Sequence, residues 1–361
     1  MKLDRIFLKG FKSIRKLELE LHSLNVLIGA NGAGKSNFVT LFELLNEIVE
    51  KRLQSFVQKK GGADAFLYFG QRTTPEIELS LWFGQNGYAC VLMPSQDGGF
   101  VFTHETCYFQ GYEYNKPYEE ELGLAHRESK LREQAKQRPG KVAEHVLSAI
   151  MSWHVYHFHD TSESAKMKQQ WAINDNFYLR PDASNLAAFL FFLERKFDQS
   201  YNLIRDTIQQ VAPFFDDFVL RPNPLNPDEI RLEWREKGSD YPFTAHHLSD
   251  GTLRFICLST LLLQPNPPST IVIDEPELGL HPYAITVLAE MLKSAAEKTQ
   301  VIVSTQSVPL INQLQPEDII IVDRLEGQSS FRRLREGEMK DWIDDYGLGD
   351  LWEKNLLGGR P

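Results

Sequence analysis

The chain contains little cysteine, with Cys90, Cys107 and Cys257 as its only thiols in 361 residues. They lie in apolar or aromatic stretches and show no C-x-x-C spacing. This arrangement argues against a disulfide framework and against a zinc site of the common cysteine type. We therefore expect three reduced thiols that pack as small hydrophobic side chains.

Long hydrophobic runs are also missing. No stretch approaches the roughly 18 apolar residues that indicate a membrane-spanning helix. The N-terminal segment "MKLDRIFLKGFKSIRKL" alternates apolar and charged residues and lacks the continuous apolar core of a signal peptide. These features predict a cytoplasmic protein with no membrane partner.

An excess of positive charge is absent as well, because the formal net charge is -10 and the pI is near 5.6. This balance argues against a protein that coats nucleic acid with its whole surface. One local exception lies in the charged segment 113–150, which we expect to be an inserted helical arm or a mobile segment. Its basic residues are either a DNA or partner contact or a solvated helical face: Arg127, Lys130, Arg132, Lys136, Arg138 and Lys141.

What the chain does contain is an alternation of strands and helices. Period-two patterns predict strands in "LDRIFLKGF" and "KLELELHSLNVLIG", and "EIELSLWF" with "YACVLM" predicts an antiparallel pair. The short apolar runs in "TIVID" and "TQVIVST" are typical of strands buried on both faces of a parallel sheet. We expect an α/β fold whose mixed sheet is flanked by helices, with an N-terminal antiparallel β subdomain and an inserted helical lobe.

The stretch "GANGAGKS" fits the phosphate-binding pattern G-x-x-x-x-G-K-[ST], between a predicted strand and a predicted helix. Its glycines allow backbone N–H groups to approach phosphate closely, Lys35 supplies a cation, and Ser36 is a magnesium ligand. A plain glycine turn with an exposed lysine is the weaker interpretation. The predicted nucleotide-binding residues of this loop are Asn31, Gly32, Ala33, Gly34, Lys35, Ser36 and Asn37.

Two carboxylates end the apolar run in "TIVIDEPE". A carboxylate at the end of a buried strand can hold the magnesium ion of a nucleotide, and a second one beside it can polarise an attacking water. We therefore predict Asp274 as a metal residue and Glu275 as the general base.

The third segment, "HHLSDGTLRF", places Ser249, Asp250 and Gly251 where a helix begins, which offers backbone donors to an anion. Taken alone, this segment also fits an ordinary N-cap.

Together these motifs resemble the ABC-type ATPases. "LSDGT" is similar to the LSGGQ signature at Leu248, Ser249 and Gly251, but Asp250 and Thr252 depart from it. "ELGLHP" stands where the family has its D-loop, and "VIVSTQS" places Gln306 at the position of the switch histidine. Glutamine can donate a hydrogen bond to phosphate but cannot exchange a proton as histidine can.

The start and the end of the chain resemble the RecF-like and SMC-like branch, in particular compact stand-alone ATPases without a long coiled coil. This resemblance implies a head-to-tail homodimer around two ATP molecules with Mg²⁺, each ATP between Lys35 of one subunit and Ser249 of the other. Candidates for the family's Q-loop are Gln71 and the segment 157–164. His157 and His159 alternate like metal ligands, but we expect a polar strand face because no third ligand matches their spacing.

We expect a single ABC-type domain with an N-terminal lobe (1–112), an inserted lobe (113–245), the signature, Walker B and switch segment (246–325) and a C-terminal tail (326–361). The expected function is an ATPase that couples dimer closure to DNA or to a separately encoded effector or nuclease, in DNA repair or antiviral defence. The alternatives are an ATP-binding switch with negligible turnover and, less favoured, a transporter motor subunit.

Overall fold

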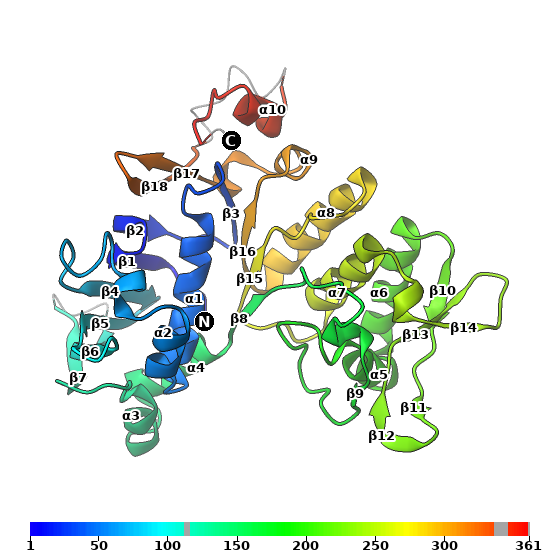
Figure 1. Ribbon diagram of the computed structural model, residues 1–361, viewed down its shortest axis with the longest axis horizontal. Helices are drawn as coiled ribbons and strands as arrows, with labels where there is room; N and C mark the ends of the chain where they lie inside the picture. The colour runs from blue at the N-terminus through cyan, green and yellow to red at the C-terminus, as the bar shows by residue number, and fades with distance from the viewer. Residues whose placement is uncertain (112–115, 336–345, 360–361) are drawn as a thin grey trace.

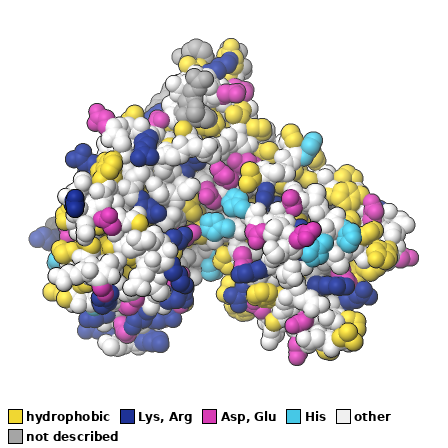
Figure 2. Space-filling view, in the orientation of Figure 1, with side chains coloured by type: hydrophobic (Ala, Val, Ile, Leu, Met, Phe, Trp, Pro, Cys, Tyr) yellow, Lys and Arg dark blue, Asp and Glu magenta, His cyan; other side chains and the backbone are white. Residues whose placement is uncertain are grey.

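The computed structural model describes residues 1–111, 116–335 and 346–359, and its elements form two lobes with a hollow between them (Figures 1 and 2). Two six-stranded sheets organise the larger lobe. The first is antiparallel with the order β2-β1-β4-β5-β6-β7. Its strands are β1 (Arg5–Phe11), β2 (Ile14–Glu20), β4 (Ile77–Phe83), β5 (Asn86–Pro94), β6 (Phe100–Phe109) and β7 (Tyr118–Gly123).

The second sheet has the order β18-β17-β3-β16-β15-β8, and all its strands are parallel except β18, which pairs antiparallel with β17. Both faces of β3, β15 and β16 are buried, which explains the apolar runs in these strands. The strands are β3 (Leu24–Ile28), β8 (Trp153–Tyr156), β15 (Thr270–Asp274), β16 (Gln300–Thr305), β17 (Ile319–Leu325) and β18 (Gln328–Arg333).

Alternate residues of the parallel strands contribute to two separate hydrophobic cores. Val272 and Ile302 point toward the antiparallel sheet and its helices, whereas Ile271 and Val303 point into the opposite core. Burial of each such side chain stabilises the fold by roughly 1.5–3 kcal/mol. The first core includes α1 (Lys35–Val49), α2 (Leu53–Lys59), α3 (Leu131–Gln137) and α4 (Val142–Met151).

The opposite core includes residues of α5 (Leu186–Lys196), α6 (Asp198–Val211), α7 (Asp250–Leu263), α8 (Pro282–Lys298), α9 (Val308–Ile311) and α10 (Leu348–Glu353). Of these, α9 and α10 lie at the top of the view, whereas α5, α6 and α7 lie in the second lobe (Figure 1). Two three-stranded sheets complete that lobe: β9 (Trp171–Ala172) with β11 (Pro222–Asn223) and β12 (Asn226–Ile230), and β10 (Phe215–Phe218) with β13 (Glu233–Glu236) and β14 (Pro242–Thr244).

The fold class predicted from the sequence is confirmed, including the antiparallel subdomain and the helical lobe. The stretch "KLELELHSLNVLIG" differs from the expected single strand, because the chain turns at Leu21–Ser23 and enters a second sheet. Segment 118–151 also contains a strand, β7, besides its helices, and packs with the antiparallel sheet. All three cysteines are free and buried, as expected.

Candidate nucleotide-binding site

The glycine loop joins β3 to α1 and is shaped by close backbone approaches. Gly34 has φ 120°, and a Cβ there would lie 2.1 Å from the hydroxyl of Ser329 on β18. A Cβ on Gly29 would lie 2.2 Å from the carbonyl oxygen of Val322. The loop therefore requires glycine at both positions for steric reasons, and at Gly34 for its φ as well.

Lys35 is the first residue of α1, and its side chain turns back into the loop. It is 5% exposed, and Nζ donates to the carbonyl oxygens of Gly29 at 2.6 Å and Ala30 at 3.1 Å. Burial lowers the pKa of Lys35, while Glu275, Asp274 and Glu277 act in the opposite direction. The ammonium group is thus held inside the curve of the loop and faces three carboxylates.

Asp274 and Glu275 follow the last buried residues of β15 at the same edge of the sheet. The hydroxyl of Ser304 on β16 donates to Oδ1 of Asp274, and the backbone N–H of Glu275 donates to the carbonyl oxygen of Ser304 at 2.8 Å. Glu275 has φ 44°, a conformation that is uncommon for a residue with a side chain. Such strain persists where the surroundings fix it, and it is frequent at functional sites.

Gln306, the residue after β16, binds both the glycine loop and the predicted base. Its Nε2 donates to Oε1 of Glu275 at 2.7 Å and to Oδ1 of Asn31 at 2.8 Å. One amide thereby joins the residue after β16 to the predicted base and to the glycine loop. The structure brings these predicted residues together although they lie far apart in the chain.

Glu277 stabilises the end of β16 and the residue that follows it. Its Oε1 accepts from the hydroxyl of Thr305 at 2.5 Å and from the N–H of Gln306 at 3.2 Å. Burial raises the pKa of Glu277, although these hydrogen bonds oppose the shift. Glu277 therefore fixes the backbone that carries Gln306.

The other loop residues have mainly structural contacts. Gly32 has φ 80°, and its carbonyl oxygen accepts from Arg324 at 3.2 Å. Ala33 is buried, and its carbonyl oxygen accepts from the Ser329 hydroxyl. Asn37 points to the turn between β1 and β2, where Nδ2 donates to Ser13 at 2.7 Å. The predicted set thus divides into residues that face the carboxylates and residues that hold the loop.

The residues present fit a magnesium ion. Ser36, at the start of α1, is exposed and offers a hydroxyl, and Asp274 offers a carboxylate at the end of β15. Hydroxyl and carboxylate oxygens are ligands that Mg²⁺ prefers, and such sites keep further positions for water and phosphate. We propose Ser36 and Asp274 as the protein ligands of this magnesium ion.

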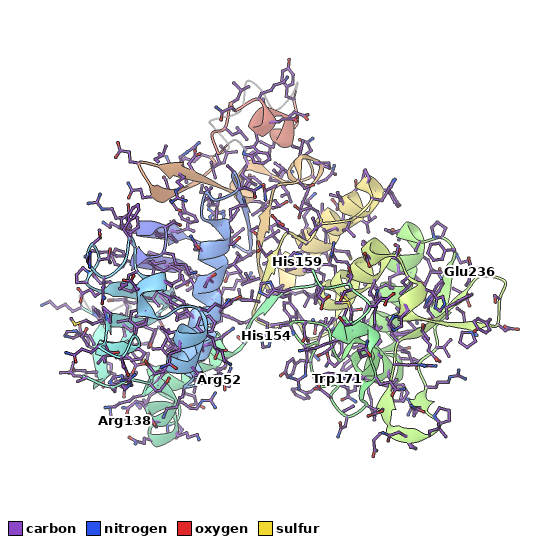
Figure 3. The ribbon with its side chains drawn as sticks, in the orientation of Figure 1. Arg52, Arg138, His154, His159, Trp171 and Glu236 are labelled. Carbon is purple, nitrogen blue, oxygen red and sulfur yellow. The ribbon has the colours of Figure 1, made fainter. Side chains whose placement is uncertain are left out.

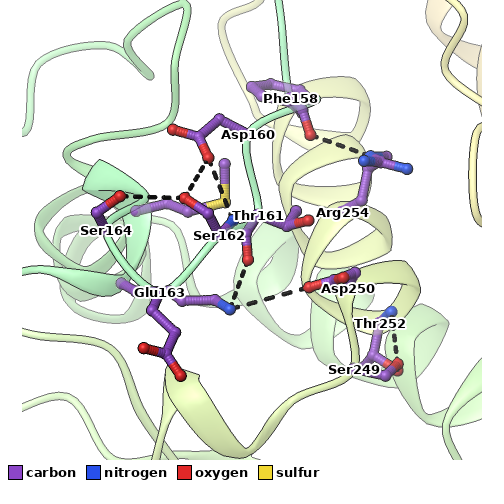
Figure 4. Close-up of polar contacts among 12 residues, drawn as sticks. Phe158, Asp160, Thr161, Ser162, Glu163, Ser164, Ser249, Asp250, Thr252 and Arg254 are labelled. Carbon is purple, nitrogen blue, oxygen red and sulfur yellow. Dashed lines mark hydrogen bonds and ion pairs between the residues drawn. The ribbon is translucent and has the colours of Figure 1, made fainter.

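The predicted signature residues lie in the other lobe, at the N-terminus of α7 (Figures 1 and 4). The Ser249 hydroxyl accepts from the N–H of Thr252 at 3.2 Å and is the N-cap of the helix. Ser249 and Asp250 are both exposed. Among the described residues, no hydrogen bond or ion pair joins Ser249, Asp250 or Gly251 to the glycine loop. One copy of the chain therefore does not bring these two halves together.

Gly251 and Arg254 attach the signature helix to the segment after β15. A Cβ on Gly251 would lie 2.4 Å from the carbonyl oxygen of Gly279. Arg254 donates to the carbonyl oxygens of Leu278, of Phe158 at 3.0 Å and of His159 at 3.2 Å. Burial lowers the pKa of Arg254. Sequence reasoning did not single out Arg254, because its partners are backbone atoms of two distant loops.

Replacement of Gly251 with alanine will destabilise the protein without changing the glycine loop. The added methyl group overlaps the carbonyl oxygen of Gly279, and overpacking of this kind costs roughly 1–3 kcal/mol. We expect a lower melting temperature, measured by circular dichroism, while binding of a fluorescent ATP analogue stays within about twofold, a change of only about 0.4 kcal/mol. An unchanged melting temperature would show that the D-loop moves away freely.

Segment 157–164 follows β8, which pairs in parallel with β15, so the residues after β8 emerge at the sheet edge that carries Asp274. His154 and His159 lie near the hollow between the lobes (Figure 3), where histidine side chains gather on the surface (Figure 2). Burial lowers the pKa of His159, and Asp274 and Glu275 oppose that shift. His157 contacts Glu43 at 3.1 Å. We propose this segment as the Q-loop of the protein.

The three arginines of the basic segment form ion pairs. On the basic segment, Arg127, Arg132 and Arg138 contact Asp97, Glu50 and Glu120 at 2.6, 2.6 and 3.0 Å. These pairs reduce the positive charge that the segment offers to DNA. In the C-terminal tail, Asp341, Asp344 and Asp345 lie outside the described residues, and α10 buries Leu351 and Trp352.

Known proteins share this fold and these sequence patterns. Residues 112–312 match the family described as "AAA domain, putative AbiEii toxin, Type IV TA system", and residues 1–139 match the "AAA ATPase domain" family. Both matches are to AAA-type domains, and the fold is that of an SMC head, with no coiled coil among the described residues. The chain belongs to the first of these two families, whose match covers more than half of its length.

Two solved structures illustrate the similarity in fold. One is the Smc head bound to the C-terminal winged-helix domain of ScpA, with a TM-score of 0.63, 15% identity, and coverage of 95% of this chain and 100% of that chain. The other is the Pyrococcus furiosus Smc head with an extended coiled coil bound to the C-terminal domain of ScpA, with a TM-score of 0.59, 15% identity and coverage of 95% and 98%. At this identity the likeness concerns the fold.

A comparison with curated proteins finds no match. Within the three described ranges, no helix combines the length and the hydrophobicity needed to cross a membrane.

Proposed function

We propose that this chain hydrolyses ATP and that two copies close head-to-tail around two ATP molecules. The observation that carries the proposal is the separation of two complementary halves. Lys35, Glu275 and Gln306 converge at one sheet edge, whereas the exposed Ser249 helix start lies in the other lobe. A second copy supplies the missing half if its signature faces the glycine loop of the first, as the resemblance implies.

In the proposed reaction, water attacks the γ-phosphorus of ATP in line with the leaving oxygen. Glu275 orients the water and accepts its proton, and Lys35 offsets charge on the transferred phosphoryl group. A magnesium ion held by Ser36 and Asp274 would neutralise phosphate charge. Gln306 positions Glu275 through the 2.7 Å hydrogen bond. Its second N–H binds Asn31 here and can donate to phosphate once it leaves Asn31, but the amide takes no proton.

Two features favour a second candidate, an ATP-binding switch with negligible turnover. Gln306 replaces a group that could titrate, and Asp250 places a carboxylate in the predicted phosphate-binding segment. Phosphate release separates the candidates: the switch closes with ATP while phosphate stays at background. For either candidate, we propose that dimer closure acts on DNA or on a separately encoded effector, in DNA repair or antiviral defence. The toxin in the matched family's description is compatible with a defence role.

Replacement of Ser249 with arginine, in a Glu275→Gln background, will prevent the ATP-dependent dimer. The long cation occupies the surface that should receive phosphate, and the N-cap bond to Thr252 is lost. We expect the mass measured by light scattering to double with Mg-ATP in Glu275→Gln and to stay that of a monomer in the double variant. Ser55→Arg, an exposed serine of α2, is the matched control. An ATP-dependent dimer in the Ser249→Arg protein would contradict this ATP sandwich, the head-to-tail dimer in which each ATP lies between the two copies.

A further inference from the structure

Asp250 presents an electrostatic problem for the proposed site. It is the first residue of α7, its side chain is 69% exposed, and it stands where the resemblance implies contact with a triphosphate. Two like charges about 4 Å apart repel by roughly 1 kcal/mol in water and by more near a protein surface. A bare carboxylate at this position would therefore weaken phosphate binding.

Lys168 lies beside this carboxylate. It ends the short 3-10 helix Lys166–Lys168, and its side chain is only 6% exposed. Nζ lies 3.9 Å from Oδ1 of Asp250 and donates to the carbonyl oxygen of Thr161 at 2.6 Å. Lysine is almost never buried to this degree without a partner, because removal of its charge from water is costly.

The neighbouring Lys166 shows that this burial is specific. It belongs to the same short helix, but its side chain is 65% exposed and pairs with Asp182 at the surface at 2.9 Å. The two lysines have the same chemistry and nearly the same position in the chain. Only Lys168 turns inward toward the start of α7.

The contact of Lys168 with Thr161 also ties this cation to the segment that follows β8. The same segment accepts hydrogen bonds from Arg254 through Phe158 and His159. Lys168 and Arg254 thus both bind the segment after β8, and each of them also connects it to α7. This arrangement holds the ammonium group of Lys168 close to the signature.

We propose that Lys168 is a positioning residue that offsets the charge of Asp250, so that the signature helix can receive the γ-phosphate of ATP bound to a second copy. The inference rests on the proposed ATP sandwich and identifies the residue that makes a signature with aspartate compatible with it. Lys168 acts through Asp250 and does not itself contact the nucleotide.

The test uses the full chain in the Glu275→Gln background and measures the ATP concentration that gives half-maximal dimer by light scattering. In Lys168→Met we expect this concentration to rise about tenfold, because Asp250 loses its ion pair with Lys168 and keeps the more distant charge of Arg254. Lys166→Met, the matched control, should leave it unchanged. In the double variant Lys168→Met, Asp250→Asn it should return to within about twofold of the parent, because both charges are removed together.

A purely structural role for Lys168 predicts no rescue, since removal of the Asp250 charge would not repair a packing defect. Failure of Asp250→Asn to rescue, or equal behaviour of the two lysine variants, would overturn the proposal. Melting temperature and binding of a fluorescent ATP analogue by the monomer check that each variant is folded. If Lys168→Met fails to fold, Lys168→Gln, which keeps a hydrogen-bond donor that can face Thr161, takes its place. We expect the same rise of about tenfold and the same reversal by Asp250→Asn, and the absence of a rise would overturn the proposal.

The outcome also distinguishes this proposal from the one on which it rests. If the Glu275→Gln parent stays monomeric at every ATP concentration, the ATP sandwich fails, and the role of Lys168 fails with it. If the parent dimerises and Lys168→Met behaves like Lys166→Met, the sandwich holds and only the role of Lys168 is refuted.

Discussion

Replacement of Glu275 with glutamine will leave ATP binding intact and reduce phosphate release by at least about 100-fold, the usual contribution of a general base. The amide can still occupy the position that φ 44° gives to residue 275, and it retains an oxygen to accept the hydrogen bond from Gln306. It cannot accept a proton from water. ATP therefore stays unhydrolysed, and the dimer that ATP forms is trapped.

The measurement is phosphate release in single-turnover conditions, with the mass in Mg-ATP recorded in parallel. Glu290→Gln is the matched control, because Glu290 is an exposed glutamate of α8 that pairs only with Lys293 at 2.8 Å among the described residues. This control should hydrolyse ATP at the parent rate. Normal turnover in Glu275→Gln would remove Glu275 from the reaction and direct attention to Glu277.

Replacement of Lys35 with alanine will abolish measurable ATP binding, with a loss of affinity of at least about 100-fold, or about 2.7 kcal/mol. The ammonium group is the cation that the loop encloses, and it is already oriented by the carbonyl oxygens of Gly29 and Ala30. Because the orientation exists before ATP arrives, little conformational entropy is lost when phosphate binds. Its removal takes away both the charge and this preorganisation.

Binding of a fluorescent ATP analogue measures the effect. Lys60→Ala is the control, since Lys60 has a half-exposed side chain and lies 3.5 Å from Glu43. Loss of two hydrogen bonds inside the loop will also lower stability, so Lys35→Met, which keeps most of the side-chain volume, is measured beside it. ATP affinity within a few-fold of the parent in a folded Lys35→Met protein would show that phosphate binds elsewhere.

Much of the fold could be predicted because its signals are local. The glycine pattern of the loop can be read from eight consecutive residues, and the apolar run before Asp274 identifies a strand buried on both faces. The same local rules failed for "KLELELHSLNVLIG". There, Asn25 receives the N–H of His22 at 2.9 Å and donates to the His22 carbonyl oxygen at 2.7 Å, which fixes a turn between two sheets.

Strand β7 was missed for a related reason. Tyr118–Gly123 is rich in glutamate, which is uncommon in strands, so its own sequence gave no strand signal. Its backbone pairs with β6, and that pairing compensates for the poor intrinsic preference. A strand that depends on its neighbour can be predicted only when the neighbour's position is known.

The sequence by itself determined the phosphate loop, the two carboxylates at the end of β15 and the start of α7, because each is recognisable from the residue types in one contiguous stretch of the chain. Only the tertiary structure decided that Gln306 joins Glu275 to Asn31, that Gly251 abuts Gly279, and that Lys168 rather than Lys166 lies beside Asp250. These pairs are distant in the chain. Their contacts follow from how the sheet and the two lobes pack, which no local pattern encodes.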